Sequence, residues 1–336
     1  MKLVLKISGV LLALVVVVAV GAYAYLNATW NKDYADYPRP AIVASTDSAT
    51  IARGEYLANA VAHCSACHQT ASGSENMTKR SGTVLGLDFG GGNVWDIPMF
   101  GRFVAANLTP DPETGIGKLS DGDVARVVRN GVGRNGKIVP FMHFSVGPMA
   151  DEDLTAVLSY LRTLKAVNHA GPPEKPGLFC KLLVKGMSPK EEAPPKWTPP
   201  GGISIERGGY LANGPADCFS CHSQLDPMHG FVIVGPRFRG EEHAEPDPTD
   251  AAFEFVTPNL TPDPETGHIT NWSEDDFVRR FKTGVVYKGS KMPWEGYARM
   301  TEDDVRSIYR YIHALAPVKH DVGPIRRAKG WKPPKA

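Results

Sequence analysis

Residues 64–68 read CSACH, residues 218–222 read CFSCH, and the nine letters NLTPDPETG occur unchanged at residues 107–115 and 259–267. The flanking segments also match. RGEYLAN at residues 53–59 corresponds to RGGYLAN at residues 207–213, and MADEDL at residues 149–154 corresponds to MTEDDV at residues 300–305. The offset between matched segments stays between 150 and 154 residues. A unit of about 115 residues is therefore duplicated, and two copies are too few for a solenoid.

Each CxxCH segment has the spacing of covalent c-type haem attachment. Cysteines three positions apart lie near one side of a helical turn, so both can form thioethers to a haem, and the following histidine can ligate the iron. Two such motifs in register within a duplicated unit are a stronger signal than one. The sequence predicts two covalently bound haem c groups, held by Cys64, Cys67 and His68 and by Cys218, Cys221 and His222.

Three other uses of these cysteines fit the sequence less well than haem attachment. A zinc site needs four ligands, whereas each half offers a clear Cys2His set at most. A thioredoxin-like dithiol needs a βαβ setting, which the sequence does not indicate. Disulfides would leave His68 and His222 unexplained. Covalent haem is the favoured interpretation.

Methionine is the usual sixth ligand of an electron-transfer haem c, and it raises the reduction potential. Met142, in the PFM loop, and Met292, in the KMPW loop, follow the two motifs at matching distances. Both are predicted to be iron ligands together with His68 and His222. His143 is an alternative ligand in the first half.

Several other residues that could be taken for ligands are predicted to have structural roles instead. Met149 and Met300 precede the last helix of each half and are predicted to pack in the core. The acidic NLTPDPETG segments are predicted to be turns rather than calcium sites. Cys180 is expected to be a buried, inert thiol. The histidines that flank the motifs, His63 and His229, are expected at the surface or beside a haem propionate.

The N-terminus has the character of a membrane span. Lys2 and Lys6 precede a run without charge from residue 7 to residue 26, about 30 Å of helix, which matches a bilayer core. Basic residues before the span place the body on the exported side, the periplasm of a bacterium. A cleaved signal peptide, with Ala22-Tyr23-Ala24 as its cleavage site, is the alternative.

Composition excludes several classes of function. Lys+Arg is 37 and Asp+Glu is 36, so a globally basic nucleic-acid binder is not expected. Gly (34) and Pro (28) are numerous, which predicts many loops. The chain contains no P-loop or HExxH motif. Redox centres are therefore the only chemistry that the motifs indicate.

The expected fold is mainly α, with two tandem domains behind the N-terminal helix. Helices are predicted over residues 51–62, 151–164, 205–212 and 301–315, and Ser120 and Ser273 are predicted to cap two more. Gly-rich stretches at residues 82–104 and 230–256 are predicted to form loops with short strands. The predicted layout is an anchor (1–30), a first domain (46–168), a proline-rich, partly extended linker (169–202), a second domain (203–318) and a basic tail (319–336).

The haem motifs, the NLTPDPETG segments and the PFM and KMPW loops together resemble the diheme cytochromes c. They are most similar to cytochrome c subunits of membrane-bound bacterial dehydrogenases for alcohol and gluconate. This resemblance covers about residues 48–317. It implies class I cytochrome c domains with low-spin Met/His haems. Those subunits typically carry three haems, whereas two CxxCH motifs occur here, and the membrane attachment here is N-terminal.

The sequence thus predicts a periplasm-facing, membrane-anchored diheme cytochrome c. It would carry electrons from a dehydrogenase or respiratory-chain donor to a quinone, an oxidase or another acceptor. The rival hypothesis is a diheme enzyme, a peroxidase or a thiosulfate-oxidising cytochrome, with an open or unusual ligand position at one haem.

Overall fold

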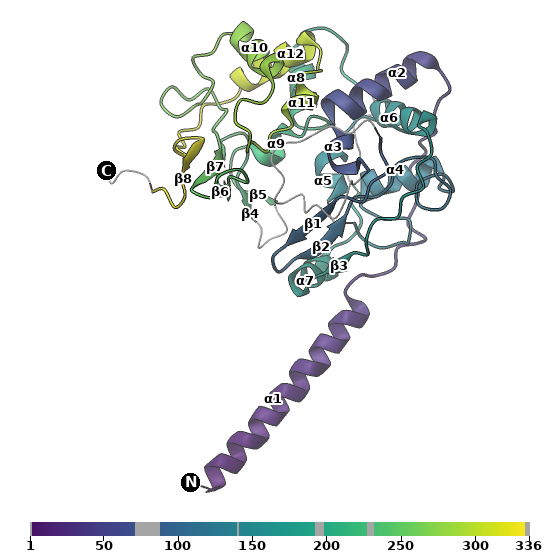
Figure 1. Ribbon diagram of the computed structural model, residues 1–336, viewed down its shortest axis with the longest axis vertical. Helices are drawn as coiled ribbons and strands as arrows, with labels where there is room; N and C mark the ends of the chain where they lie inside the picture. Colours follow the sequence, from purple (N-terminus) through teal and green to yellow (C-terminus); the bar gives the residue numbers. More distant parts are fainter. Residues whose placement is uncertain (1, 71–87, 140, 192–197, 227–231, 333–336) are drawn as a thin grey trace.

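The computed structural model describes residues 2–70, 88–139, 141–191, 198–226 and 232–332. A long N-terminal helix, α1 (Lys2–Thr29), projects from a globular part that contains all the other elements (Figure 1). Helices account for most of the regular structure, and the strands are two to six residues long. The predicted mainly helical class is confirmed.

The two copies of the duplicated sequence place their helices in the same order. The first half contains α2 (Ser48–Tyr56), the π-helical η1 (Leu57–Val61), α3 (Cys64–His68), β1 (Val94–Ile97), β2 (Gly101–Val104), α4 (Asp121–Asn130), α5 (Met142–Val146) and α6 (Asp151–Thr163). The second half contains α8 (Ile205–Ala212), α9 (Cys218–Cys221), β4 (Leu225–Asp226), β5 (Val232–Ile233), β6 (Glu241–Pro246), β7 (Phe253–Thr257), α10 (Glu274–Thr283), α11 (Trp294–Tyr297) and α12 (Glu302–His313).

Helix starts follow the local sequence closely. Ser120 Oγ accepts a hydrogen bond from the Asp123 amide, and the Asp123 carboxylate accepts one from the Ser120 amide. The same reciprocal capping box joins Ser273 and Asp276. Both predicted caps are confirmed. The helix predicted over residues 51–62 begins earlier, at Ser48, because Asp47 caps it.

In each half the first and last helices cross at a glycine. A Cβ added to Gly54 would overlap the carbonyl of Ala156 in α6, and a Cβ added to Gly208 would overlap the carbonyl of Ser307 in α12. The backbones therefore approach more closely than any side chain allows. These are the glycines of the matched RGEYLAN and RGGYLAN segments.

Two tyrosines from the same segments join the halves to each other. Tyr56 Oη donates to the Asp304 carboxylate at 2.6 Å, and Tyr210 Oη donates to the Asp153 carboxylate at 2.7 Å. Within its own half, each aspartate also pairs with an arginine: Asp153 with Arg53 and Asp304 with Arg207. The duplicated sequence thus forms reciprocal bonds across the interface, and one hydrophobic core contains residues from both halves.

The segment between the halves contains structure that the sequence analysis missed. Within residues 169–202 lie β3 (Lys175–Pro176), which pairs with β2, and α7 (Leu178–Gly186). The helix forms because residues 177–188 contain no proline. Cys180 and Val184 are buried on its inner face, as expected for Cys180, and burial raises the pKa of that thiol to about 11.

Part of the basic C-terminal segment is also structured. β8 (Arg326–Ala328) pairs with β7. Arg326 bonds to the buried Asp247, and Arg327 bonds to Glu254. The basic side chains thus have acidic partners on the second half, which explains why a segment that sequence describes as a tail forms a strand.

Replacing Gly208 by alanine tests the close helix crossing. The added methyl must push α8 away from α12, so the free energy of unfolding should fall by about 1–3 kcal/mol. Thermal unfolding of the holoprotein measures this change. Gly186→Ala is the matched control, because no atom lies within 4 Å of a Cβ at that position. Equal melting temperatures for the two variants would contradict the proposed role of Gly208.

Candidate haem-attachment sites

Both CxxCH motifs begin at an unusual backbone turn. His63 and Asp217, the residues directly before the first cysteines, have φ values of 38° and 53°. Such left-handed conformations are uncommon outside glycine. The short helices α3 and α9 follow these turns. The two motifs therefore share one backbone geometry, and this geometry sets the position of each first cysteine.

The five cysteines are free thiols. Cys218 is buried and Cys64 is half-buried, whereas Cys67 and Cys221, the second cysteines of the motifs, are exposed. Burial raises the pKa of Cys64 and of Cys218 to about 12, so these thiols are protonated at neutral pH. In the described parts of the chain, no three His, Cys, Asp or Glu side chains converge on a metal-sized position, which disfavours a four-ligand zinc site there.

The two motif histidines are held in one tautomer. His68 Nδ1 lies 2.7 Å from the carbonyl oxygen of Ala106, and His222 Nδ1 lies 3.1 Å from that of Pro258. A carbonyl oxygen can only accept, so Nδ1 carries the hydrogen in both rings and Nε2 keeps its lone pair. Within the described residues, neither Nε2 has a hydrogen-bond partner. This is the arrangement of a histidine prepared to ligate a metal through Nε2.

Burial also keeps both imidazoles neutral. It lowers the pKa of His68 and lowers that of His222 to about 4. A neutral ring is the form that ligates a metal. Two cysteines, a following neutral histidine and a free Nε2 in each half fit a covalently attached haem.

The NLTPDPETG turns fix the carbonyls that hold these histidines. Ala106 and Pro258 directly precede the two turns. Asn107 Nδ2 donates to the Val167 carbonyl at 2.7 Å, and Asn259 Nδ2 donates to the Val318 carbonyl at 2.8 Å. Each turn is thereby tied to the segment after the last helix of its half. The turn thus positions the carbonyl that accepts the hydrogen bond of the motif histidine, a role that the sequence analysis did not predict.

The acidic residues of the turns are satisfied within the turns. The Asp111 carboxylate accepts from the Glu113 and Thr114 amides, and Asp263 makes the equivalent bonds to Glu265 and Thr266. Hydrogen bonds from Thr114 lower the pKa of Asp111. These contacts support the predicted structural role of the segments.

The four methionines of interest separate into two pairs. Met149 and Met300 are 2% and 0% exposed and lie in the hydrophobic core, which confirms the predicted packing role. Met142 is the first residue of α5, Met292 lies two residues before α11, and both are half-buried. Iron ligation by Met142 and Met292 stays a prediction.

The two motifs lie beside each other. The His63 ring packs edge-on against the Tyr297 ring, with 5.4 Å between centroids. Although Cys67 is exposed as a residue, surrounding protein atoms desolvate its thiol, and this desolvation, followed by the nearby Asp217 carboxylate, raises the pKa of Cys67 to about 11. Asp217 directly precedes the other motif, so the attachment sites meet where the halves join. His63 is half-buried and packs against Tyr297; His229 lies outside the described residues.

No family model matches the chain. Three curated relatives align with most of it. The cytochrome c subunit of alcohol dehydrogenase (quinone) from Gluconacetobacter polyoxogenes is 29% identical over 82% of this chain and 58% of its own length. The gluconate 2-dehydrogenase cytochrome c subunit of Pantoea cypripedii is 27% identical over 80% of this chain and 60% of its own. A diheme cytochrome c-type protein of Cereibacter sphaeroides is 26% identical over 76% and 83%.

These similarities confirm the resemblance that the motifs indicated, because relatives along most of the chain are cytochrome c subunits of dehydrogenases and a diheme cytochrome c. A cytochrome c relationship implies covalently bound haem c and an electron-transfer role. The chain spans only about 58–60% of the length of the two dehydrogenase subunits.

Sequence reasoning missed the carbonyl partners of the histidines and the tyrosine between the motifs. The nine-residue identity of the turns was a signal for the first, since it marks a constraint stronger than a surface loop needs. Nothing in the sequence near Tyr297 indicates its contact with His63, because that contact joins the two halves.

Asn259→Ala tests the role of the turn. The variant loses the bonds to the Thr261 amide and the Val318 carbonyl, so the Pro258 carbonyl is held less firmly. We expect the free energy of unfolding to fall by about 1–3 kcal/mol. In an optical redox titration of the purified holoprotein, the reduction potential of one of the two proposed haems should also shift.

Asn271→Ala is the control, because Asn271 is exposed and has no side-chain hydrogen bond among the described residues. If Asn259→Ala changes neither the free energy of unfolding nor the reduction potentials by more than Asn271→Ala does, the turn does not support His222.

Proposed function

We propose that this chain is a membrane-anchored, diheme electron-transfer cytochrome c. Cys64, Cys67 and His68 would hold one haem, and Cys218, Cys221 and His222 would hold the other. The repeated histidine geometry carries the proposal, since both imidazoles are neutral and offer Nε2. The cytochrome c relatives support it.

The bound haem supplies one-electron exchange between ferrous and ferric iron. The chain's own residues determine how that exchange is used. The carbonyls of Ala106 and Pro258 orient the histidines and increase their basicity as ligands. Met142 and Met292 would close the sixth positions, which favours electron transfer over binding of substrate. Each half would form a class I cytochrome c domain, as the resemblance implies.

The adjoining motifs favour transfer between the two haems within one chain. His63, directly before the first motif, contacts Tyr297 of the second half, and that tyrosine donates to the carbonyl of Ala216, two residues before Cys218. A short, packed path therefore connects the segments that would carry the haems. Electrons could enter at one site and leave at the other without a second protein encounter.

The proposed location is the periplasmic face of the bacterial cytoplasmic membrane. Residues Lys6–Thr29 form a candidate span with a mean hydropathy of 2.5, and none of its most apolar stretch is buried by protein. A signal sequence has the same properties. The uncharged run from residue 7 to residue 26 is longer than the roughly 7–15 residues of a signal-peptide h-region, which supports retention. At the far end of this helix, Lys181 Nζ donates to Asn27 and Lys185 Nζ donates to Thr29.

A dehydrogenase is the proposed electron donor, and a quinone or an oxidase is the proposed acceptor. This part of the proposal rests on the names of the relatives, which are cytochrome subunits of dehydrogenases. Co-purification of the tagged full-length chain from its native membrane, followed by reduction of its haems with candidate substrates, tests it.

Replacing Met142 or Met292 by alanine tests the ligand assignment. Each variant should lose about half of the weak red charge-transfer band that reports methionine sulfur on ferric haem, because one of two sites is changed. One reduction potential should fall as well. Optical redox titration of the purified oxidised protein measures both.

Met300→Leu is the matched control, since Met300 is fully buried in the core and leucine fills a similar volume. An unchanged band in Met142→Ala or in Met292→Ala rejects that ligand. High-spin haem in the unsubstituted protein, together with peroxide turnover, favours the diheme enzyme instead.

A further inference from the structure

Helix α7 presents apolar side chains on both of its faces. Cys180 and Val184 point inward and are 3% exposed, whereas Leu178 and Leu182 are 53% and 54% exposed. Residues four apart share one face of a helix, so the two leucines form an outward pair. Met99, 76% exposed, lies at the turn between β1 and β2. We name Met99, Leu178 and Leu182 the α7 patch.

The α7 patch is held firmly in place. The amide of Gly177 donates to the Phe100 carbonyl at 2.6 Å, and the ring of Phe179 packs edge-on against that of Phe100 at 4.8 Å. Met99 and Leu178 are each next in sequence to one of these residues. The outward leucines are therefore a fixed surface rather than the side chains of a loose linker.

The patch lies next to the end of the N-terminal helix. Figure 1 shows α7 on the side of the globular part that α1 approaches. Lys181 Nζ bonds to Asn27 Oδ1 at 2.5 Å, and Lys185 Nζ lies 4.5 Å from the centroid of the Tyr25 ring. Two successive turns of α7 thus contact the last turns of α1.

These contacts set the depth of α7 relative to a bilayer. Exposed Tyr23 and Tyr25, followed by Trp30, form the aromatic end of the apolar helix, which is where headgroups meet the acyl chains. An element that binds residues 25–29 lies at this level. Exposed leucines flanked by lysines are the side chains of an interfacial helix.

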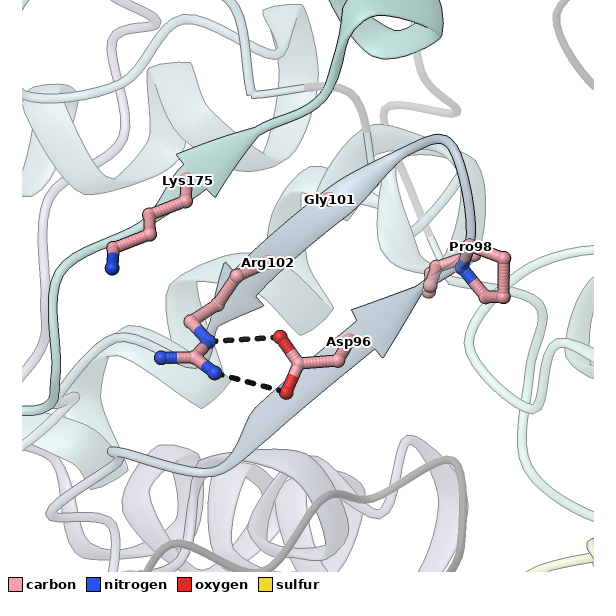
Figure 2. Close-up of a pocket in the computed structure, with 6 residues that line it drawn as sticks. Asp96, Pro98, Gly101, Arg102 and Lys175 are labelled. Atoms are coloured by element: carbon pink, nitrogen blue, oxygen red, sulfur yellow. Dashed lines mark hydrogen bonds and ion pairs between the residues drawn. The ribbon is translucent and has the colours of Figure 1, made fainter.

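Basic groups continue beside the patch. A shallow pocket of 450 Å³ on the β1–β2–β3 sheet is lined by Lys175, Arg102 and Asp96 among others. Figure 2 shows Arg102 paired with Asp96, while Lys175 projects along the same side. In the described chain Lys175 has no ion-pair partner. With Arg102 paired to Asp96, Lys175 is the cation of this lining that is left to contact a phosphate headgroup.

We propose that the α7 patch inserts into the headgroup–acyl boundary of the membrane that α1 spans. The proposal rests on the membrane anchor of the proposed function. The globular part would then lie against the bilayer in one orientation, rather than swinging from α1 as from a tether. Both haem sites would have fixed heights above the membrane, which suits electron exchange with a membrane-bound partner.

Nitroxide labels test this insertion in the full-length holoprotein. The protein is reduced, so that its low-spin haems are diamagnetic, and reconstituted in nanodiscs of phosphatidylcholine with phosphatidylglycerol. Labels on Leu182→Cys, Ile205→Cys and Val17→Cys report the relative access of oxygen, which enters lipid, and of a water-soluble nickel chelate. Ile205 is the matched control, an equally exposed residue (53%) on α8, away from α1. The unsubstituted protein gives the background from the buried Cys180.

The expected result is preferential oxygen access at 182 and 17, and preferential nickel access at 205. If the nickel chelate reaches the label at position 182 as readily as the label at position 205, while the label at position 17 is still in lipid, the insertion is overturned and the anchor is intact. Shielding of 182 from both reagents overturns it in favour of a protein contact. Nickel access at 17 overturns both the anchor and the insertion.

A second variant separates insertion from simple proximity to the membrane. A label on Met99→Cys should lose its oxygen access when Leu178 and Leu182 are both changed to asparagine, and should keep it when Ile203 and Ile205 are changed instead. Oxygen access at 99 that survives the leucine changes contradicts insertion by α7.

Discussion

The hydrogen bond from each motif histidine to a backbone carbonyl is the constraint on which the rest of the structure depends. The bond fixes the tautomer, leaves Nε2 free and orients the ring from a buried position. Its acceptor lies directly before an NLTPDPETG turn, and an asparagine of that turn binds the segment after the last helix. Three distant parts of each half must therefore be in register before a histidine can face an iron.

Duplication extends this constraint to the interface. The same RGxYLAN segment supplies a glycine for the helix crossing inside its half and a tyrosine for the aspartate of the other half. Because each aspartate also pairs with an arginine of its own half, a change at one position disturbs both copies. The two CxxCH motifs meet at this interface, so the contacts that join the halves would also determine the separation of the two proposed haems.

Much of the fold and most of the site could be predicted from local sequence. Capping boxes act over a few residues, so Ser120 and Ser273 could be identified directly as caps, and the six proposed attachment residues follow from the equally local CxxCH spacing. Helix α7, the β8 strand and the contact between His63 and Tyr297 depend on partners far away in the chain. The proline-rich composition of the segment between the halves does not indicate that Cys180 and Val184 are buried. Likewise, the basic composition of the C-terminal segment does not indicate that its arginines bond to Asp247 and Glu254.

The central claim is that each half carries one covalent haem on its CxxCH motif. The most direct measurement is the intact mass of the purified full-length chain, combined with peptide mapping of the haem-bearing fragments. The account predicts two haems per chain, one on the peptide with Cys64 and Cys67 and one on the peptide with Cys218 and Cys221. A single haem, or unmodified thiols in a protein matured by a haem-attaching host, would contradict it.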